Sequence, residues 1–212
     1  MPIPLELLAP AKNLAVGMAA IDHGADAVYI GAPKFSARSE AGNELTDIAR
    51  LIDHAHFFHA KVYVALNTIL TDTEIPVALD MINAIFEMGV DGLIIQDPGL
   101  LELDLPPIPL IASTQMHNVT PEKVKFLEHV GFKRVILGRE LSIEEIGAIR
   151  RETRVELEAF VHGALCVSYS GQCYMSQAVA KRSGNRGVCA QPCRSRYTLE
   201  DGDGRHVDAS RS

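Results

Sequence analysis

"GADAVYIG", residues 24–31, joins the end of one regular element to the start of another. A glycine after a helical segment is typical of a left-handed helix cap, and the apolar run from Ala27 to Gly31 is typical of a buried strand. The same punctuation recurs at "GVDG", residues 89–92, and at "GFKR", residues 131–134. This repetition indicates βα units and favours a (βα) barrel over an open doubly wound sheet.

Seven short apolar runs alternate with helical segments along the chain. They are nearly continuously apolar, which suits parallel strands buried on both faces. The predicted strands are Leu5 to Ala9, Ala27 to Gly31, Val62 to Asn67, Gly92 to Gln96, Leu110 to Thr114, Arg134 to Gly138 and Val155 to Val161. Helix starts are expected at Thr46-Asp47, at Thr120-Pro121 and at Ser142, which has a glutamate three residues on.

The predicted fold class is therefore α/β, a TIM-barrel-like (βα) fold with about seven parallel strands. A complete eight-stranded barrel usually needs about 250 residues, and this chain has 212. We expect it to be a fragment of a longer protein. The predicted parts are barrel units in 1–163, a cysteine-rich segment in 164–196, and a hairpin and truncated tail in 197–212, with "DGDG" as the turn.

Composition is that of a globular protein, with 47% hydrophobic and 22% charged residues. The N-terminus shows no basic region or small-residue cleavage site of a secretory signal, and no apolar run reaches the roughly 18 residues of a membrane span. We expect a cytoplasmic protein without a membrane partner. Thiols stay reduced there, so clustered cysteines more often bind metal or do chemistry than form disulfides.

Polar residues follow nearly every predicted strand. In (βα) barrels the active site lies at the carboxyl ends of the strands, so these residues as a set predict a binding cavity, although singly each is typical of helix caps and loops. They include Lys12, Gln96, Asp97, Ser113 and Thr114. The catalytic candidates are Gln115, Arg139, Glu140 and His162, and the substrate-binding candidates are Asn67 and His117.

The region around the cysteines is basic, although the net charge of the chain is -7. Residues 159–198 contain no Asp or Glu but include Lys181, Arg182, Arg186, Arg194 and Arg196. A local positive field of this kind favours an anionic substrate or RNA. A basic loop that balances its own thiolates explains the pattern equally well. The first four of these residues are our RNA-binding candidates.

All four cysteines lie within 28 residues: Cys166, Cys173, Cys189 and Cys193. Four thiolates suit tetrahedral zinc or an iron–sulfur cluster. Only the last two have the tight spacing of zinc fingers, so spacing leans slightly toward a cluster, with unligated cysteines as the remaining interpretation. His162 lies four residues before Cys166, which raises its candidacy for a functional role.

Here the sequence resembles a known family. "FVHGALCVSYSGQCYMS", residues 160–176, resembles the signature of the U32 peptidases, also called collagenase-like peptidases, and "SGNRGVCAQPCRSRYTL", residues 183–199, resembles the stretch that follows it. The resemblance extends to "ELLAPAKN", "GADAVYIGAPKFSAR", "ASTQMHNVTP" and "RVILGREL". The second motif is most similar to that of members acting on large-subunit ribosomal RNA.

The resemblance implies a 4Fe-4S cluster on the four cysteines, oxygen-independent hydroxylation of a ribosomal RNA cytidine or tRNA uridine, and prephenate as the small-molecule hydroxyl donor. It also implies an eighth strand beyond Ser212. The alternatives are the peptidase of the family's name, with a cysteine activated by His162, and a zinc-binding module without catalysis. The sequence lacks His-Glu-x-x-His and Gly-x-Ser-x-Gly. We expect the chain by itself to be inactive.

Overall fold

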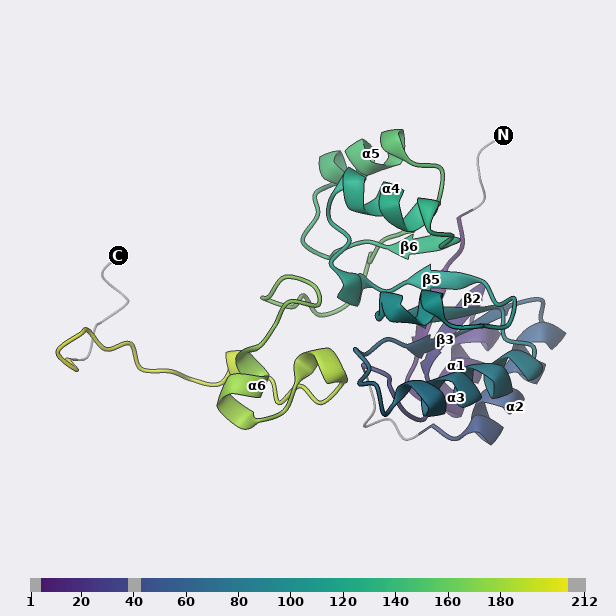
Figure 1. Ribbon diagram of the computed structural model, residues 1–212, viewed down its shortest axis with the longest axis horizontal. Coiled ribbons are helices and arrows are strands. Elements are labelled where there is room, and N and C mark those ends of the chain that lie inside the picture. The colour runs from purple at the N-terminus through teal and green to yellow at the C-terminus, as the bar shows by residue number, and fades with distance from the viewer. Residues whose placement is uncertain (1–4, 38–42, 206–212) are drawn as a thin grey trace.

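Seven parallel strands form a curled, TIM-barrel-like half-barrel with helices on its outside (Figure 1). The structure is a computed structural model that describes residues 5–37 and 43–205. The strands pair in chain order, each with its neighbours in sequence, which confirms the predicted fold class and strand number. They are β1 Leu8–Ala11, β2 Ala27–Gly31, β3 Lys61–Leu66, β4 Gly92–Ile95, β5 Leu110–Ala112, β6 Arg134–Ile136 and β7 Glu156–Glu158.

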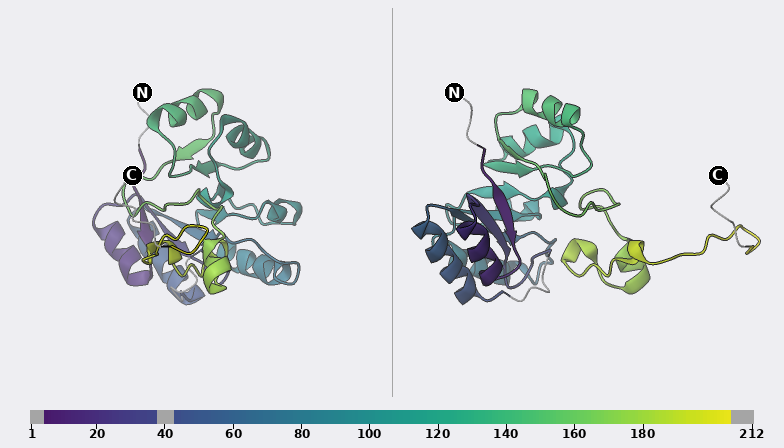
Figure 2. Two further views of the ribbon diagram at one scale, coloured as in Figure 1. Left: turned by 90° about the vertical axis from the view of Figure 1, so that its left-hand side faces the viewer. Right: turned by 180° about the vertical axis from the view of Figure 1, so that it is seen from behind.

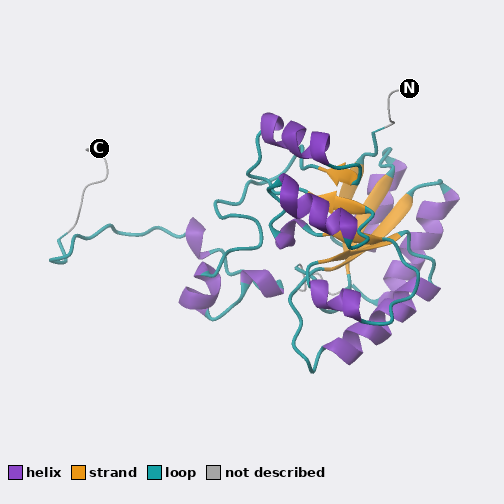
Figure 3. Cartoon of the chain, turned by 45° about the horizontal axis from the view of Figure 1, so that its top comes forward, coloured by secondary structure: helices purple, strands orange, loops and turns teal. Residues whose placement is uncertain are grey.

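Five helices follow strands of the barrel and cover its outer surface, whereas the strands gather at the centre (Figure 3). The helices are α1 Leu14–Asp22, α2 Leu45–Phe57, α3 Ile75–Glu87, α4 Pro121–His129 and α5 Ile143–Glu152. The 3₁₀ turns η2 Pro98–Glu102 and η3 Thr114–Met116 follow β4 and β5. No helix in the described ranges has the length and apolar character needed to cross a bilayer.

Two of the three expected helix starts are confirmed. The third lies earlier than expected, because α2 begins at Leu45 and Thr46 and Asp47 lie within its first turn. The Thr120 hydroxyl accepts a hydrogen bond from the Lys123 N–H, and Ser142 and Glu145 form a capping box. Gly24, Gly89 and Gly131 have φ of 97°, 81° and 105°, a backbone region that glycine enters without strain. These glycines return each chain segment from its helix to the next strand.

Alternating side chains divide the apolar residues into two clusters. The larger cluster lies between the sheet and its helices and includes Val28, Val62 and Leu93, all fully buried. The smaller one fills the inside of the half-barrel and includes Tyr63, Ala65, Ile94, Ile111 and Ile136. A sheet buried on both faces explains why its strands read as continuous apolar runs.

The first and last strands differ from the predicted bounds. The first was expected at Leu5 to Ala9, but pairing with β2 begins at Leu8, opposite Ala27, and continues to Ala11. Leu5 is almost fully exposed, so the prediction that relied on its apolar side chain placed the start of the strand too early. The seventh was expected to reach Val161 but ends at Glu158, because β7 pairs with β6 alone and lacks a second neighbour in the described sheet.

Ion pairs close the inside of the half-barrel where its strands begin. Arg134, at the start of β6, contacts Glu6 at 2.5 Å and Glu156 at 2.9 Å. Glu6 also contacts Lys61 at 3.2 Å and accepts a hydrogen bond from the Tyr63 hydroxyl. Burial by itself would raise the pKa of Glu6, but Arg134 and Lys61 outweigh it and hold that pKa below the ordinary value. These charges are satisfied within the fold.

The cysteine-rich segment lies beyond the opposite end of the barrel, where the strands end (Figures 1 and 2). It contains α6 Met175–Ala180 and the 3₁₀ turns η4 Gly184–Arg186 and η5 Pro192–Arg194. The expected turn at residues 201–204 forms, since the Gly204 N–H donates to the Asp201 carbonyl. Residues 206–212 of the expected hairpin lie outside the described residues.

Asn118 ties the ends of two strands together and gives a stability test. Its buried side-chain amide donates to the Ser113 carbonyl at 2.9 Å and to the Ile136 carbonyl at 2.8 Å. Asn118→Ala removes both of these buried hydrogen bonds, so we expect the free energy of unfolding to fall by about 2 kcal/mol. Urea unfolding followed by far-UV circular dichroism measures it. Asn83→Ala, on the exposed side of α3, is the matched control, and an equal loss there would contradict this role.

Candidate functional site

A cavity of about 170 Å³ opens at the carboxyl ends of the strands. Its floor is apolar and comes from the inside of the barrel, with Ala65, Ile94 and Ile136 among its lining residues. Its rim is mostly polar and comes from the residues that follow six of the seven strands. The lining includes Lys12, Asn67, Ser113, Thr114, Gln115 and Arg139, all predicted from the sequence, and also Tyr29, Ser36, Glu158 and Phe160.

One wall of the cavity is a chain of hydrogen bonds between neighbouring strands. The Asn67 side chain, after β3, accepts from the Ala37 N–H at 2.9 Å and donates to the Ser113 hydroxyl at 3.2 Å. Gln96, after β4, is buried and donates to the Gln115 carbonyl at 3.3 Å. This wall is held by its own partners, so Asn67 and Gln115 lie in a fixed arrangement at the mouth.

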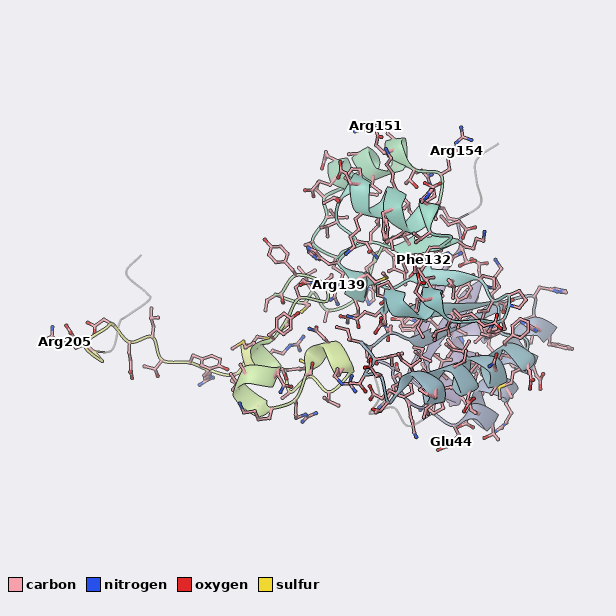
Figure 4. All side chains as sticks on the ribbon, viewed as in Figure 1. Glu44, Phe132, Arg139, Arg151, Arg154 and Arg205 are labelled. Carbon is pink, nitrogen blue, oxygen red and sulfur yellow. The ribbon has the colours of Figure 1, made fainter. Side chains whose placement is uncertain are left out.

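The other wall carries two charged side chains, Arg139 and Glu158, each with a buried atom that makes no hydrogen bond within the described ranges. Arg139 follows β6 and lies where the barrel faces the cysteine-rich segment (Figure 4). Its guanidinium lies 5.7 Å from the centre of the Phe160 ring, and its Nε is buried with no hydrogen-bond partner in the described residues. Glu158, at the end of β7, has a buried Oε2 that also lacks a hydrogen-bond partner there.

Glu158 is the charged lining residue with the most perturbed environment. Arg134 Nη1 lies 3.6 Å from its Oε2. Burial raises the pKa of Glu158 to about 7, because the attraction of Arg134 is too weak to offset the loss of solvent and the nearby Glu6 carboxylate repels it. Near neutral pH this carboxyl therefore exists in both its charged and its neutral form.

Glu140 attaches the cysteine-rich segment to the mouth of the barrel. Its carboxylate accepts hydrogen bonds from the Ser170 N–H at 3.0 Å and from the Ser170 hydroxyl at 2.8 Å. His117 Nδ1 lies 3.4 Å from the same carboxylate, and the His117 ring packs edge-on against Tyr169. Burial would raise the pKa of Glu140, but the Ser170 hydrogen bonds and His117 hold it below its ordinary value. Glu140 and His117 thus act together, next to the cavity rather than in its lining.

Two glycines bring the same segment into backbone contact with the barrel. Gly171 has φ of 71°, and a Cβ there would lie 1.8 Å from the Gln115 carbonyl oxygen. Gly187 has φ of 84°, and its Cβ would lie 2.2 Å from the Ser36 carbonyl oxygen. No other residue fits at these distances, so both positions require glycine. Both contacts are made to residues that line the cavity.

A third attachment involves Arg186, an RNA-binding candidate. Its guanidinium donates to the Ile69 carbonyl and to the Glu74 carboxylate, both at 2.6 Å. The bond from Arg186 is the main reason why the pKa of Glu74 falls to about 2. The structure therefore commits Arg186 to holding the segment on the barrel.

The remaining predicted residues lie away from the cavity. His162 is exposed in the loop after β7, because that strand ends earlier than expected. Lys181, Arg182 and Arg194 are exposed on the cysteine-rich segment. Lys181 and Arg182 contact carbonyls of that segment, at Ala178 and Val188. The catalytic candidates are thus divided: Gln115 and Arg139 line the cavity, Glu140 lies beside it, and His162 lies outside it.

The four cysteines are free thiols, and all but Cys173 are exposed. The segment folds back on itself, since the Ala190 N–H donates to the Ser176 hydroxyl at 2.9 Å. In number and chemistry the thiols suit a four-thiolate centre. Their arrangement does not fit one, because within the described parts of the chain no three Cys, His, Asp or Glu side chains lie close enough to share a metal ion.

Sequence reasoning missed Glu158, Tyr29, Ser36 and Phe160 as cavity residues. Glu158 lies within a run that was interpreted as a nearly continuously apolar strand, although a glutamate at a position facing the inside of a barrel is itself an unusual feature. Tyr29 lies on β2, one residue before Ile30 on the opposite face. For Ser36 and Phe160, whose loops leave the strands irregularly, the sequence carried no comparable signal.

Gly171→Ala tests the attachment of the cysteine-rich segment. The added methyl group would overlap the Gln115 carbonyl, so we expect the segment to separate from the barrel. Amide hydrogen exchange in 164–196 should accelerate while exchange in the central strands stays unchanged. Gly163→Ala is the matched control, since Gly163 also has positive φ, 129°, but no atom within 4 Å of its Cβ position. Equal exchange in the two variants would show that the Gly171 contact is unimportant.

The comparisons with known proteins agree with this geometry. The "23S rRNA 5-hydroxycytidine C2501 synthase" of Escherichia coli (strain K12) is 55% identical over 96% of this chain and 31% of its own length. The "tRNA hydroxylation protein P" of the same strain is 40% identical over 93% of this chain and 45% of its own length. This chain thus spans less than half of either relative.

A solved structure supports the fold, and a family profile covers almost the whole chain. "The Structure of the U32 Peptidase Mk0906" superimposes with a TM-score of 0.64 over 75% of this chain and 69% of that one, at 18% identity. At that identity the likeness concerns the fold. The profile of peptidase family U32 matches residues 12–211. The chain therefore belongs to peptidase family U32.

Proposed function

We propose that this chain forms the barrel and cysteine-rich parts of a protein that hydroxylates an RNA base, with a cytidine of large-subunit ribosomal RNA as the substrate. A tRNA uridine is the alternative substrate. The relatives named for hydroxylation of ribosomal RNA and tRNA support the reaction class, and the higher identity to the ribosomal RNA protein favours cytidine.

The observation that carries the proposal is the position of the cavity. It lies at the strand ends, is lined by hydrogen-bonding groups, and adjoins a segment whose residues 159–198 contain no carboxylate side chain. Lys181, Arg182 and Arg194 are exposed on that segment. Cations beside a small polar cavity are what a single-stranded RNA needs to place one base inside a protein while its phosphates stay outside.

The prephenate proposed as hydroxyl donor carries two carboxylates, and Lys12 gives the cavity lining a cationic side chain for one of them. The 4Fe-4S cluster, with zinc as its alternative, stays a proposal on chemical grounds alone. The free thiols supply suitable donors, but binding would require the cysteine-bearing loops to move together.

Peptidase activity, the alternative that the family name suggests, gains no support from the geometry. A thiol nucleophile needs a base within hydrogen-bonding distance. In the described residues no cysteine is hydrogen-bonded to a histidine, and the Cys189 sulfur instead accepts from the Gln191 N–H at 3.4 Å. His117 contacts Glu140 and Tyr169.

Nucleoside analysis of a deletion strain tests the proposed reaction. We expect 5-hydroxycytidine to disappear from 23S ribosomal RNA when the gene encoding this chain is deleted, and to return with the wild-type gene, as measured by mass spectrometry of digested RNA. Loss of a hydroxylated uridine from tRNA would identify the alternative substrate. Unchanged modification of both RNAs would refute the proposed function.

Metal analysis tests the proposed cofactor separately. The full-length protein, purified without oxygen, should contain iron and acid-labile sulfide, and Cys189→Ser should lose most of both because one of four ligands is removed. Ser168→Ala, within the same segment, is the control and should retain them. Zinc in place of iron, or a metal content that does not depend on Cys189, would contradict the four-cysteine iron–sulfur centre.

A further inference from the structure

We infer that Glu158 and Arg139 recognise the hydrogen-bonding edge of a cytosine base turned into the cavity, and so select cytosine over uracil. This inference rests on the proposed function for the identity of the base. The choice of Glu158 and Arg139 rests on the structure, because the sequence assigned base recognition to neither residue.

Both side chains have hydrogen-bonding capacity that the fold does not use. In the described residues the buried Glu158 Oε2 has only a long ion pair with Arg134, at 3.6 Å, and the buried Arg139 Nε has no hydrogen-bond partner. The two line the same cavity without forming an ion pair with each other. Leaving a buried polar group unpaired costs about 1–3 kcal/mol, and more for a charged group. An acceptor with no close hydrogen bond and a donor without a partner among the described residues, in one cavity, suit a ligand that carries both partners.

The size and the aromatic lining of the cavity restrict the shape of the ligand. The cavity is smaller than the roughly 300 Å³ at which pockets for drug-sized molecules begin, so it suits a single ring. Phe160 and Tyr29 lie in its lining, and bases stack on aromatic rings of this kind. The chemistry of the lining thus fits a flat ring with a polar edge.

The two pyrimidines differ in the hydrogen-bonding groups at this edge. Cytosine carries an exocyclic amine beside acceptor atoms N3 and O2, and a carboxylate is the usual acceptor for that amine, whereas arginine donates to base acceptors. Uracil presents an oxygen where cytosine has the amine. An ionised Glu158 would repel that oxygen, whereas a neutral Glu158 could donate to it. Discrimination should therefore depend on the charge of Glu158.

The surroundings of Glu158 set that charge. Arg134 from β6 faces it at 3.6 Å, with Glu6 next to Arg134, and Tyr63 and Glu156 contact the same ion-pair cluster. On the cavity side the charged groups are Lys12 and Arg139. Since burial raises the pKa of Glu158 to about 7, its carboxylate form predominates above neutral pH and its neutral form below.

Binding of two short RNAs tests the inference. The probes are single-stranded ribo-oligonucleotides that differ only in one central cytidine or uridine, and fluorescence anisotropy with the full-length protein at fixed salt gives their affinities. Near pH 8 we expect roughly tenfold tighter binding of the cytidine probe. Near pH 6 the preference should shrink, because Glu158 becomes neutral.

The variants assign the preference to its residues. Glu158→Gln should bind both probes about equally at either pH, because an amide both donates and accepts without titrating. Glu87→Gln is the matched control: it makes the same change at an exposed side chain on α3, outside the cavity lining, and should behave as wild type. Arg139→Lys keeps a positive charge but loses the planar donors, so it should weaken cytidine binding several-fold.

Every outcome bears on the inference. A wild-type protein with no preference near pH 8, or a Glu158→Gln protein that keeps both the preference and its pH dependence, would overturn it. If Glu158→Gln does not fold, the Arg139→Lys result decides, and unchanged cytidine binding would overturn the inference. The nucleoside analysis is independent of these affinities. Hydroxylation could thus be refuted while base selection by the cavity stands, and the reverse also holds.

Discussion

Backbone contact between Gly171 and Gln115 is the constraint on which the arrangement of the site depends. Parallel strands bring their carboxyl ends to one side of the sheet, so this side is open unless another part of the chain covers it. The cysteine-rich segment approaches closely because Gly171 has no Cβ and can adopt a positive φ. Ser170, the preceding residue, can then bind Glu140. The position of the cysteines relative to the cavity follows from these two neighbouring contacts.

The two ends of the half-barrel use charge differently. At the amino ends, Arg134 contacts three carboxylates, which compensates for its partial burial. At the carboxyl ends, Arg139 Nε and Glu158 Oε2 are buried without a hydrogen-bond partner in the described residues, and Glu158 makes only the longest of these three contacts with Arg134. An unsatisfied pair in a cavity reduces stability, which is typical of groups placed for a ligand rather than for the fold. The contrast within one molecule is a stronger argument for function than the polarity of the cavity itself.

The sequence predicted the repeated architecture because its local signals are strong. Glycine caps and the Ser142 capping box depend on a few adjacent residues, and the strands carry their own apolar pattern. The polar residues that follow the strands were also predictable, because the parallel topology brings the strand ends together irrespective of loop conformation. Asn67, Gln115 and Arg139 accordingly line the cavity.

The remaining features depend on contacts between distant residues. Arg186 looked like an RNA ligand because of the charges near it in sequence, but Glu74, more than a hundred residues away, binds it. His162 looked close to the site because β7 was expected to be longer. Burial inside the half-barrel raises the pKa of Glu158 to about 7, Glu6 adds to the rise and Arg134 opposes it, so no local pattern could reveal this value.

The family assignment and the relatives give this geometry its chemical context, and the attachment of the cysteine-rich segment is the claim that the whole account requires. A double-mutant cycle on Glu140→Gln and Ser170→Ala tests it most directly, with the free energy of local opening of residues 168–173 measured by hydrogen exchange. The account predicts a coupling energy of about 1 kcal/mol or more between the two substitutions. Strictly additive effects would show that the segment does not rest on the barrel through this contact.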